Sequence, residues 1–207
     1  MIANSLSDLT ACKINEFDTE ALRQSISLIR TLNWTKHVNR RVNSGGWDIF
    51  PLRVPSHTIN QHPIQQCFNI ENNTEWCNTK PLSNTNTLLQ VLATLHCPLE
   101  SVRLMRLFPR AHIKPHQDQG LSVNNGKARL HIPIESNDRL SFVVNNHVIP
   151  MKTGELWYIN ADQIHEVINH GKTSRINLVI DCLTNDWLIG QLMKSKHKIN
   201  SPIACRN

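Results

Sequence analysis

The stretch SVRLMRLF, residues 101–108, largely alternates between side chains suited to two different environments, and this alternation decides the fold class. Residues i and i+2 of an extended chain point to the same side, so such a run is typical of a strand with one buried face. Similar runs follow at short intervals: ARLHIPI (128–134), LSFVV (140–144), ELWYI (155–159) and RINLVID (175–181). Turn-forming residues such as Asn125-Gly126 separate them. Residues 98–185 are therefore predicted to form an antiparallel, cupin-like jelly-roll.

Two helices are predicted before these runs. TEALRQSISLIRTL (19–32) places leucine and isoleucine at helical spacing, and Asp18 or Thr19 is suited to cap its first turn. The segment 38–84 is rich in Asn, Gly, Pro, Gln and Ser, so loops and short strands are expected there, including VNSGGWDIFPLRV. A second helix is expected at about 84–94, where LLQVLATL supplies an apolar face.

These patterns predict that residues 1–207 form a single domain. Residues 1–97 are expected to form helices and loops that pack on the outside of the β core and cover its pocket. Residues 98–185 form the core, and residues 186–207 form a helix, predicted from DWLIGQLMKSK, and a tail. The expected fold class is mainly β with flanking helices.

The composition narrows the kinds of partner. The chain has a formal net charge of +6 and a sequence pI of about 9.2, but its Lys and Arg residues are dispersed and aromatic residues make up only 5%. This is not the basic, base-stacking surface of a nucleic-acid-binding protein, whereas an acidic small molecule suits the charge. We expect a small-molecule substrate, no nucleic acid and no membrane partner; the pattern specifies no oligomeric state.

The six cysteines favour a reducing compartment. They form no CxxC pair, and their spacing fits no zinc pattern. The start of the sequence lacks the basic end and apolar run of a secretory signal, and no stretch of about 18 apolar residues is present to span a membrane. We therefore expect a cytoplasmic protein with free thiols.

The stretch KPHQDQG, residues 114–120, supplies a candidate metal site. His116 and Asp118 are two positions apart and face one point if the segment is extended, which Pro115 favours. His165 follows ELWYIN and the loop ADQ, and a jelly-roll brings strands that are distant in sequence side by side. Two imidazoles and one carboxylate leave coordination positions open, which suits non-haem Fe(II) with a chelating cosubstrate and O2.

Arg175 is the strongest candidate for an anion-binding residue. It lies ten residues after His165 on an alternating run, where Arg175, Asn177, Val179 and Asp181 share one face. An arginine inside an otherwise apolar barrel needs an anion, and its planar fork matches a carboxylate. Other pairs two residues apart add polar groups to the same cavity, namely Arg129 with His131 and Arg103 with Met105.

Together, LMRLFPRAHIKPHQDQG (104–120), RLHIPI (129–134) and GELWYINADQIHEVINHGKTSRINLVID (154–181) resemble the aspartyl/asparaginyl β-hydroxylase family of Fe(II)- and 2-oxoglutarate-dependent oxygenases. Within that family, the small bacterial members that act as cis-proline hydroxylases look most similar. The likeness covers roughly residues 99–182 and is weaker in VNSGGWDIFPLR. Some relatives carry a serine where this chain has Met105.

The resemblance implies a double-stranded β-helix that holds iron. Carried over by position, the metal ligands are His116, Asp118 and His165. Arg175 binds the distal carboxylate of the cosubstrate 2-oxoglutarate, while His131 and Arg103 lie near its other end. Arg129 faces the substrate and pairs with its carboxylate.

Residues around this set are expected to shape the pocket. Trp47 and Arg53, in GGWDIFPLR, are candidates to cover it, and Trp47 is a candidate to contact the substrate. Glu166 and Asn169 are possible hydrogen-bond partners that hold the histidine ligands in one tautomer.

The function that follows is a dioxygenase that uses Fe(II), 2-oxoglutarate and O2 to hydroxylate a small carboxylate-bearing substrate. A free amino acid, proline-like or Asp/Asn-like, is the expected substrate. A peptidyl Asp or Asn side chain, a carrier-bound amino acid and a lipid-linked acyl chain are further possibilities. Two other classes stay open: a cupin-like metal-dependent isomerase or lyase that needs no Arg175, and a non-catalytic, ligand-binding jelly-roll in which His116 and His165 are incidental.

Overall fold

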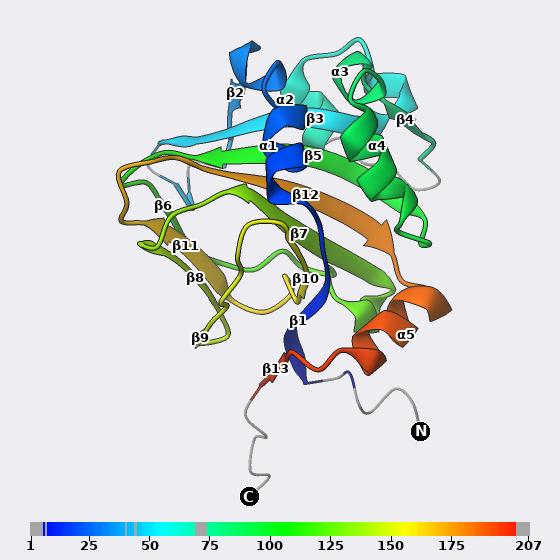
Figure 1. Ribbon diagram of the computed structural model, residues 1–207, viewed down its shortest axis with the longest axis vertical. Helices are drawn as coiled ribbons and strands as arrows, with labels where there is room; N and C mark the ends of the chain where they lie inside the picture. Colours follow the sequence, from blue (N-terminus) through cyan, green and yellow to red (C-terminus); the bar gives the residue numbers. More distant parts are fainter. Residues whose placement is uncertain (1–5, 7, 40, 44, 69–73, 202–207) are drawn as a thin grey trace, which may run out of the picture.

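The structure, a computed structural model, describes residues 6, 8–39, 41–43, 45–68 and 74–201. Two antiparallel sheets form its framework (Figure 1). The large sheet runs in the order β13 (Lys198–Asn200), β1 (Leu9–Glu16), β10 (Glu155–Ile159), β7 (Lys127–Glu135), β12 (Arg175–Leu183), β5 (Leu99–Leu107), β3 (Trp47–Pro55) and β2 (Thr35–Lys36), with β4 (Trp76–Asn78) paired to β3. The predicted mainly β jelly-roll is confirmed.

The small sheet lies across from the large one. Its order is β6 (His112–His116), β11 (His165–Asn169), β8 (Leu140–Val144) and β9 (His147–Val148). Apolar side chains from both sheets meet between them, including Leu107 and Ile159 from the large sheet and Phe142 and Val167 from the small one. These four side chains also line a cavity between the sheets, which they share with polar residues.

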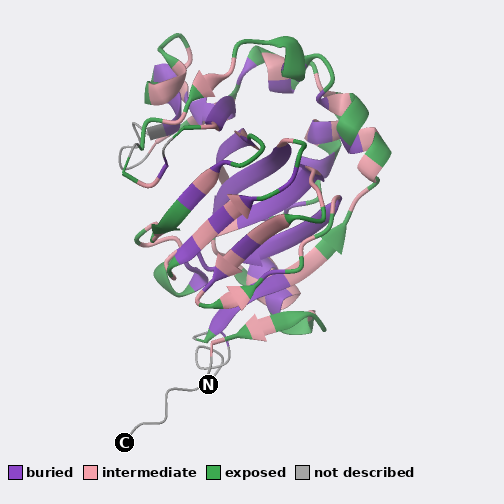
Figure 2. Cartoon of the chain, turned by 90° about the vertical axis from the view of Figure 1, so that its left-hand side faces the viewer, coloured by how far each residue is buried: buried purple, intermediate pink, exposed green. Residues whose placement is uncertain are grey.

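Helices cover the opposite face of the large sheet. They are α1 (Thr19–Ser25), α2 (Pro63–Phe68), α3 (Lys80–Ser83), α4 (Asn86–Ala93) and α5 (Asp186–Lys194), with short 3-10 turns η2 (Ile29–Thr31), η3 (Ser56–Thr58) and η4 (Val123–Asn125). Leu22 of α1 and Leu88 of α4 belong to the same buried cluster as Leu178 of β12. Figure 2 shows the result, with buried strands at the centre and exposed residues on the helices and loops.

Alternation along β12 separates these two environments. Ile176, Leu178 and Ile180 pack in the cluster beneath the helices, while Arg175 and Asn177 line a cavity on the other face of the strand. Because successive side chains of a strand point to opposite faces, one strand supplies both the core and the polar lining. The predicted division of this strand into two faces is confirmed.

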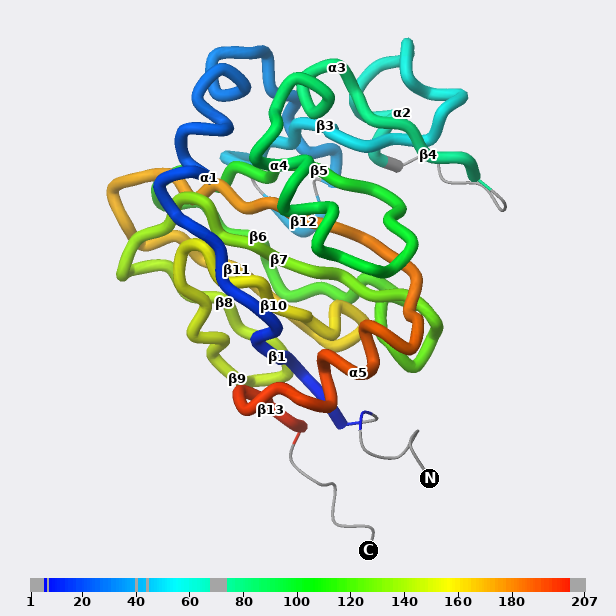
Figure 3. Tube along the Cα trace, turned by 45° about the vertical axis from the view of Figure 1, so that its right-hand side comes forward, coloured from blue at the N-terminus to red at the C-terminus, as the bar shows by residue number. Residues whose placement is uncertain are grey.

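The first 97 residues contain strands as well as the helices and loops that were expected. β1 was not predicted, yet it pairs with β10 on one side and β13 on the other, and Figure 3 shows it running alongside them. β3 is a continuous nine-residue strand in a stretch predicted as loops and short strands. Pairing with β5 along its length overrides the turn-forming composition around it. The N-terminal part therefore extends the sheet rather than only covering it.

Helix and turn boundaries were partly correct. Asp18 caps α1 by accepting a hydrogen bond from the Ala21 amide at 2.7 Å, but the helix ends at Ser25 instead of continuing to residue 32. Ser25 Oγ donates to the Leu22 carbonyl at 2.6 Å, where such side-chain bonds compete with the helix. The predicted helices at 84–94 and 186–196 correspond to α4 and α5. In contrast, the stretch PRAHIKP (109–115), whose two prolines indicate a turn between strands, contains four of the five residues of β6.

Among the described residues, no helix has both the length and the apolar character needed to cross a membrane. The five cysteines that the structure describes, Cys12, Cys67, Cys77, Cys97 and Cys182, are free thiols. Cys205 lies outside the described residues.

Candidate active site

Strand register brings the two candidate histidines together. His116, the last residue of β6, lies directly opposite His165, the first residue of β11. Asp118 follows in the loop after β6, and its amide donates to the Ala161 carbonyl at 2.9 Å. Nε2 of His116 lies 4.0 Å from Oδ1 of Asp118, and Nε2 of His165 lies 3.9 Å from Oδ2. One ligand atom from each residue lies within 4.8 Å of the others, as metal coordination requires.

Backbone carbonyls fix the orientation of both imidazoles. Nδ1 of His116 lies 2.8 Å from the Lys114 carbonyl, and Nδ1 of His165 lies 2.9 Å from the Gln163 carbonyl. A carbonyl only accepts, so Nδ1 is the donor in each ring, and the neutral tautomer that this bond favours has its lone pair on Nε2, free for a metal. The predicted partners were wrong, because Glu166 contacts His112 and the Asn169 side chain contacts backbone carbonyls and Asn137.

The protonation states in this cluster suit a metal ion. Burial, together with the neighbouring His116, lowers the pKa of His165 to about 4, so its imidazole is neutral at pH 7. Burial opposes ionisation of Asp118, but Arg129 and the two histidines more than offset it and hold the pKa of this carboxyl below its usual range. Neutral imidazoles and an ionised carboxylate are the forms that coordinate metals.

A cavity of about 1000 Å³ contains all of these ligands and extends between the sheets. Trp47 lines it, as predicted, and stacks on His37 with ring centroids 3.5 Å apart and planes tilted by 10°. Trp47 Nε1 is buried and has no hydrogen-bond partner within the described part of the chain. Arg53 was predicted beside Trp47 but is directed elsewhere, toward the Leu99 carbonyl and Asn78.

Arg175 lies in the same cavity without a carboxylate partner in the described residues. Its side chain is buried, with the residue 4% exposed, and its guanidinium carbon lies 5.6 Å from the centre of the Phe142 ring. Nε and Nη2 make no hydrogen bond to any described residue. Burial lowers the pKa of Arg175 to about 10, which still leaves the group charged at pH 7. A charged donor pair left open in this way is suited to a bound carboxylate.

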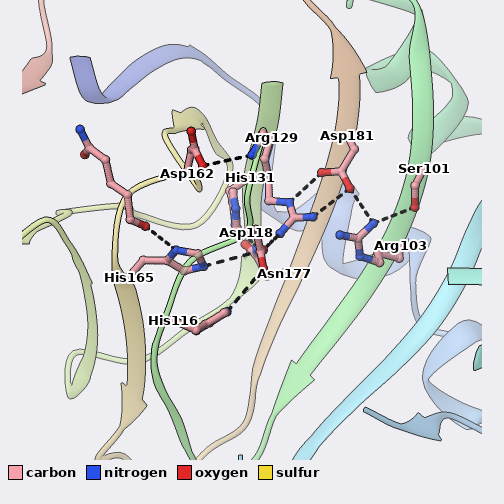
Figure 4. A network of polar contacts seen from close by, with 12 residues as sticks. Ser101, Arg103, His116, Asp118, Arg129, His131, Asp162, His165, Asn177 and Asp181 are labelled. Carbon is pink, nitrogen blue, oxygen red and sulfur yellow. Dashed lines mark hydrogen bonds and ion pairs between the residues drawn. The ribbon is translucent and has the colours of Figure 1, made fainter. Parts of the chain in front are cut away.

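Arg129 and Arg103 also line the cavity, but a buried carboxylate joins them (Figure 4). Asp181 accepts from Arg129 Nε at 2.7 Å and Nη2 at 3.0 Å, and from Arg103 Nη1 at 2.9 Å. Arg129 Nη1 donates to Oδ2 of the metal-ligand candidate Asp118. The guanidinium predicted to meet a substrate carboxylate is thus already paired within the chain.

Asp181 and Asn177 are two cavity residues to which no role was assigned from the sequence. Asp181 lies opposite Arg129 in the register between β12 and β7. Asn177 Nδ2 lies 2.7 Å from Nδ1 of the buried His131, and burial together with Arg175 holds the pKa of His131 well below its ordinary value. The alternation of the sequence placed both residues on the same face of the strand as Arg175, and therefore in the cavity. It did not indicate which residues they contact.

Comparison with known proteins gives a family match over most of the chain. Residues 13–185 match the family described as Aspartyl/Asparaginyl beta-hydroxylase. The L-proline cis-4-hydroxylase of Rhizobium meliloti (strain 1021) is 30% identical over 104 residues, which are 49% of this chain and 37% of that enzyme. The matched region therefore spans little more than a third of that curated relative.

Two solved structures share the fold. An oxidoreductase of the 2OG-Fe(II) oxygenase family from Burkholderia pseudomallei has a TM-score of 0.57 and 15% identity, covering 89% of each chain. HygX from Streptomyces hygroscopicus, solved with nickel and 2-oxoglutarate bound, has a TM-score of 0.50 and 9% identity, covering 86% of this chain and 84% of that chain. At these identities the likeness concerns the fold.

Proposed function

Because the chain belongs to the aspartyl/asparaginyl β-hydroxylase family, we propose that it is an Fe(II)- and 2-oxoglutarate-dependent dioxygenase that hydroxylates a small, carboxylate-bearing substrate. The observation that carries the proposal is the buried guanidinium of Arg175, which has Nε and Nη2 unpaired among the described residues. It lines the same cavity as the cluster of His116, Asp118 and His165. With Fe(II), 2-oxoglutarate and O2 bound, the cofactors supply conversion of a C–H bond to an alcohol with release of succinate and CO2.

The three ligand candidates fit ferrous iron. His116 and His165 present Nε2 atoms and Asp118 presents a carboxylate oxygen, while the cavity leaves space on the remaining side. Two histidines and one carboxylate with open positions are the set used by non-haem Fe(II) oxygenases. Structural zinc would instead favour four closed ligands, usually including cysteine.

The rest of the cavity fits a dicarboxylate. Arg175 would hold the distal carboxylate of 2-oxoglutarate through its two unpaired donors. Apolar side chains from both sheets, including Phe142, Val167 and Ile159, line the same cavity, and the Phe142 ring lies beside the Arg175 guanidinium, so this lining would exclude water around a bound ligand. Excluding water strengthens the charge-assisted hydrogen bonds of the guanidinium and protects the reaction from side chemistry.

The substrate region lies beside Arg129 and Trp47. Arg129 retains N–H groups beyond those that contact Asp181 and Asp118, so it can also donate to a substrate carboxylate next to the metal. The flat Trp47–His37 stack forms a wall of the same cavity. The name of the Rhizobium relative supports a free amino acid, and proline is the first candidate. The free thiols support the expected reducing cytoplasm.

A substrate screen tests the proposal. Metal-free protein is loaded with Fe(II) without O2, then mixed with 2-oxoglutarate, O2 and single free amino acids. We expect succinate to form together with a product heavier by one oxygen atom for proline or a related amino acid. A peptide that carries Asp or Asn is tested in parallel to separate a peptidyl substrate from a free one. Metal-dependent turnover without consumption of 2-oxoglutarate would contradict the proposal and favour an isomerase or lyase.

A further inference from the structure

We propose that Asp162 is a positioning residue for the metal centre, which it serves by fastening the loop that carries Asp118. This inference rests on the proposed function, because it assumes that His116, Asp118 and His165 bind a metal. Asp162 lies in the loop between β10 and β11, three residues before His165. Asp162 does not belong to the group of described residues whose ligand atoms lie close enough to share a metal ion, which is His116, Asp118 and His165.

The Asp162 carboxylate accepts three hydrogen bonds from the facing loop. Oδ1 accepts from the Gly120 amide at 3.0 Å and from Gln117 Nε2 at 3.1 Å. Oδ2 accepts from Asn125 Nδ2 at 2.9 Å. Figure 4 shows Asp162 with one of these contacts near the polar network. Both oxygens of one side chain are therefore committed to holding the segment that runs from β6 to η4.

The two residues that flank Asp118 give the loop little anchorage, whereas Asp118 itself contacts Arg129. Gln117 and Gln119, on either side of Asp118, are both exposed. Gly120 has a φ of +82°, the left-handed region that favours glycine, so the chain turns sharply directly after the ligand. A ligand on a loop of this kind loses conformational freedom when it binds a metal. Three bonds to a carboxylate order the loop beforehand.

Position makes the contact relevant to all three ligands. Gln117 separates His116 from Asp118, and Gly120 comes two residues after Asp118. Asp162 itself belongs to the segment that leads into His165, and the Asp118 amide bonds to its neighbour Ala161. One side chain thus joins the two segments from which every ligand projects. Groups that hold metal ligands in place commonly change metal affinity about 10- to 100-fold when they are removed.

Co(II) binding tests the proposal without any need for turnover. Metal-free wild-type protein and Asp162→Ala are titrated with Co(II), and the visible absorption bands of the bound ion are recorded. We expect Asp162→Ala to bind Co(II) about 10- to 100-fold more weakly and to give altered bands, because Asp118 is no longer held in place. Asp138→Ala, which removes an exposed aspartate from the turn between β7 and β8, is the matched control and should match wild type.

Two further variants separate the hydrogen bonds from the charge. Asp162→Asn removes the negative charge but keeps an oxygen for Gly120 and Gln117, so we expect it to retain most of the wild-type affinity. Gln117→Ala combined with Asn125→Ala removes two of the three hydrogen bonds and leaves that of the Gly120 amide, so it should weaken Co(II) binding, but by less than Asp162→Ala does. A loss in Asp162→Asn equal to that in Asp162→Ala would assign the effect to charge and overturn the fastening role.

The two proposals fail in different ways. Equal Co(II) affinity and equal spectra in wild type and Asp162→Ala would overturn the role of Asp162 while leaving the metal centre in place. Failure of the wild-type protein to bind Co(II) would overturn the proposed function, and the role of Asp162 with it.

Discussion

Arg129 and Arg175 line one cavity from adjacent strands of one sheet, yet only the charge of Arg129 is balanced by carboxylates of the described residues. Arg129 donates to two carboxylates, Asp181 and Asp118, whereas Arg175 has no carboxylate partner in the described residues. Burial lowers the pKa of both groups, but at Arg129 the two carboxylates more than offset it and raise the pKa. At Arg175 burial acts alone and lowers the pKa to about 10.

The difference indicates which end of the cavity is complete before any ligand binds. A buried charge with a good partner costs the fold little, while a buried charge without one is destabilising. The Arg129 end is neutralised within the chain, so it holds a fixed shape around the metal ligands. The Arg175 end keeps two donors unsatisfied, and a carboxylate from outside the chain would relieve that penalty. The region around Arg129 is therefore preorganised for the metal, whereas Arg175 provides binding energy for a carboxylate ligand.

The largest expected effect comes from Asp118, which joins the Arg129 end to the metal. Asp118→Ala should lower metal affinity by more than about 100-fold, since loss of a ligand exceeds the loss of its supporting contacts. The metal-free variant should melt near the wild-type temperature, because Arg129 keeps its two bonds to Asp181. Calorimetric metal titration and thermal melting measure both quantities. Wild-type turnover by this variant would remove Asp118 from the metal centre.

Asp181 is expected to dominate stability at the same end. Asp181→Ala leaves Arg129 and Arg103 buried without their shared carboxylate, which should lower the free energy of unfolding by about 3–5 kcal/mol. Ser101→Ala is the control, because it removes an uncharged acceptor from Arg103 and leaves the charge balance intact, so it should cost less, about 1.5–3 kcal/mol. Urea denaturation of the metal-free proteins compares them. Similar costs for both variants would show that Asp181 does not carry the charge balance.

Arg175 should show the reverse behaviour, with a large effect on binding and a small one on the fold. Arg175→Met keeps the bulk of the side chain and removes the charge, so affinity for 2-oxoglutarate should fall about 30- to 150-fold, or about 2–3 kcal/mol. The free energy of unfolding without ligand should equal or exceed the wild-type value, because the variant removes a buried charge that has no carboxylate partner among the described residues. Tryptophan fluorescence titration and urea denaturation measure the two effects. A stability loss as large as that of Asp181→Ala would abolish the contrast between the two arginines.

The sequence predicted the cavity lining better than the pairing within it. Alternation alone placed Arg175 on the polar face of β12, and the spacing of His116 and Asp118 brought them to one point. The pairing of Asp181 with Arg129 depends on the register between β12 and β7, which no local pattern encodes. The groups that orient His116 and His165 are backbone carbonyls, which every residue has, so side-chain types gave no signal.

The same distinction explains the errors in the fold. The core strands have strong local alternation, and their existence followed from it. β1 and β3 owe their extended form to distant partners, β10 and β5, which lie more than 40 residues away in the sequence. Local composition cannot report a partner at that separation, because the pairing forms only in the folded chain. The resemblance to a known family concerned mostly the later strands and added little here.

The smallest effect that we predict is a difference in how the stability contributions of Asp181 and Arg175 depend on pH. Burial opposes ionisation of Asp181, but Arg103 and Arg129 more than offset it and lower its pKa. A lowered folded-state pKa stabilises the protein above the unfolded value of about 3.9, and this contribution is lost as pH falls below it, by about 1.4 kcal/mol per pH unit. The stability gap between wild type and Asp181→Asn should therefore be level from about pH 8 to pH 5 and shrink below about pH 4.

The gap between wild type and Arg175→Met should stay level over the same range, since no described carboxylate contacts Arg175. Urea denaturation at a series of pH values compares the two gaps. A gap for Asp181→Asn that does not shrink in acid would mean that Arg103 and Arg129 are not balanced by an ionised Asp181. The Arg129 end would then be as uncompensated as the Arg175 end, and both ends would depend on ligands for their charge balance.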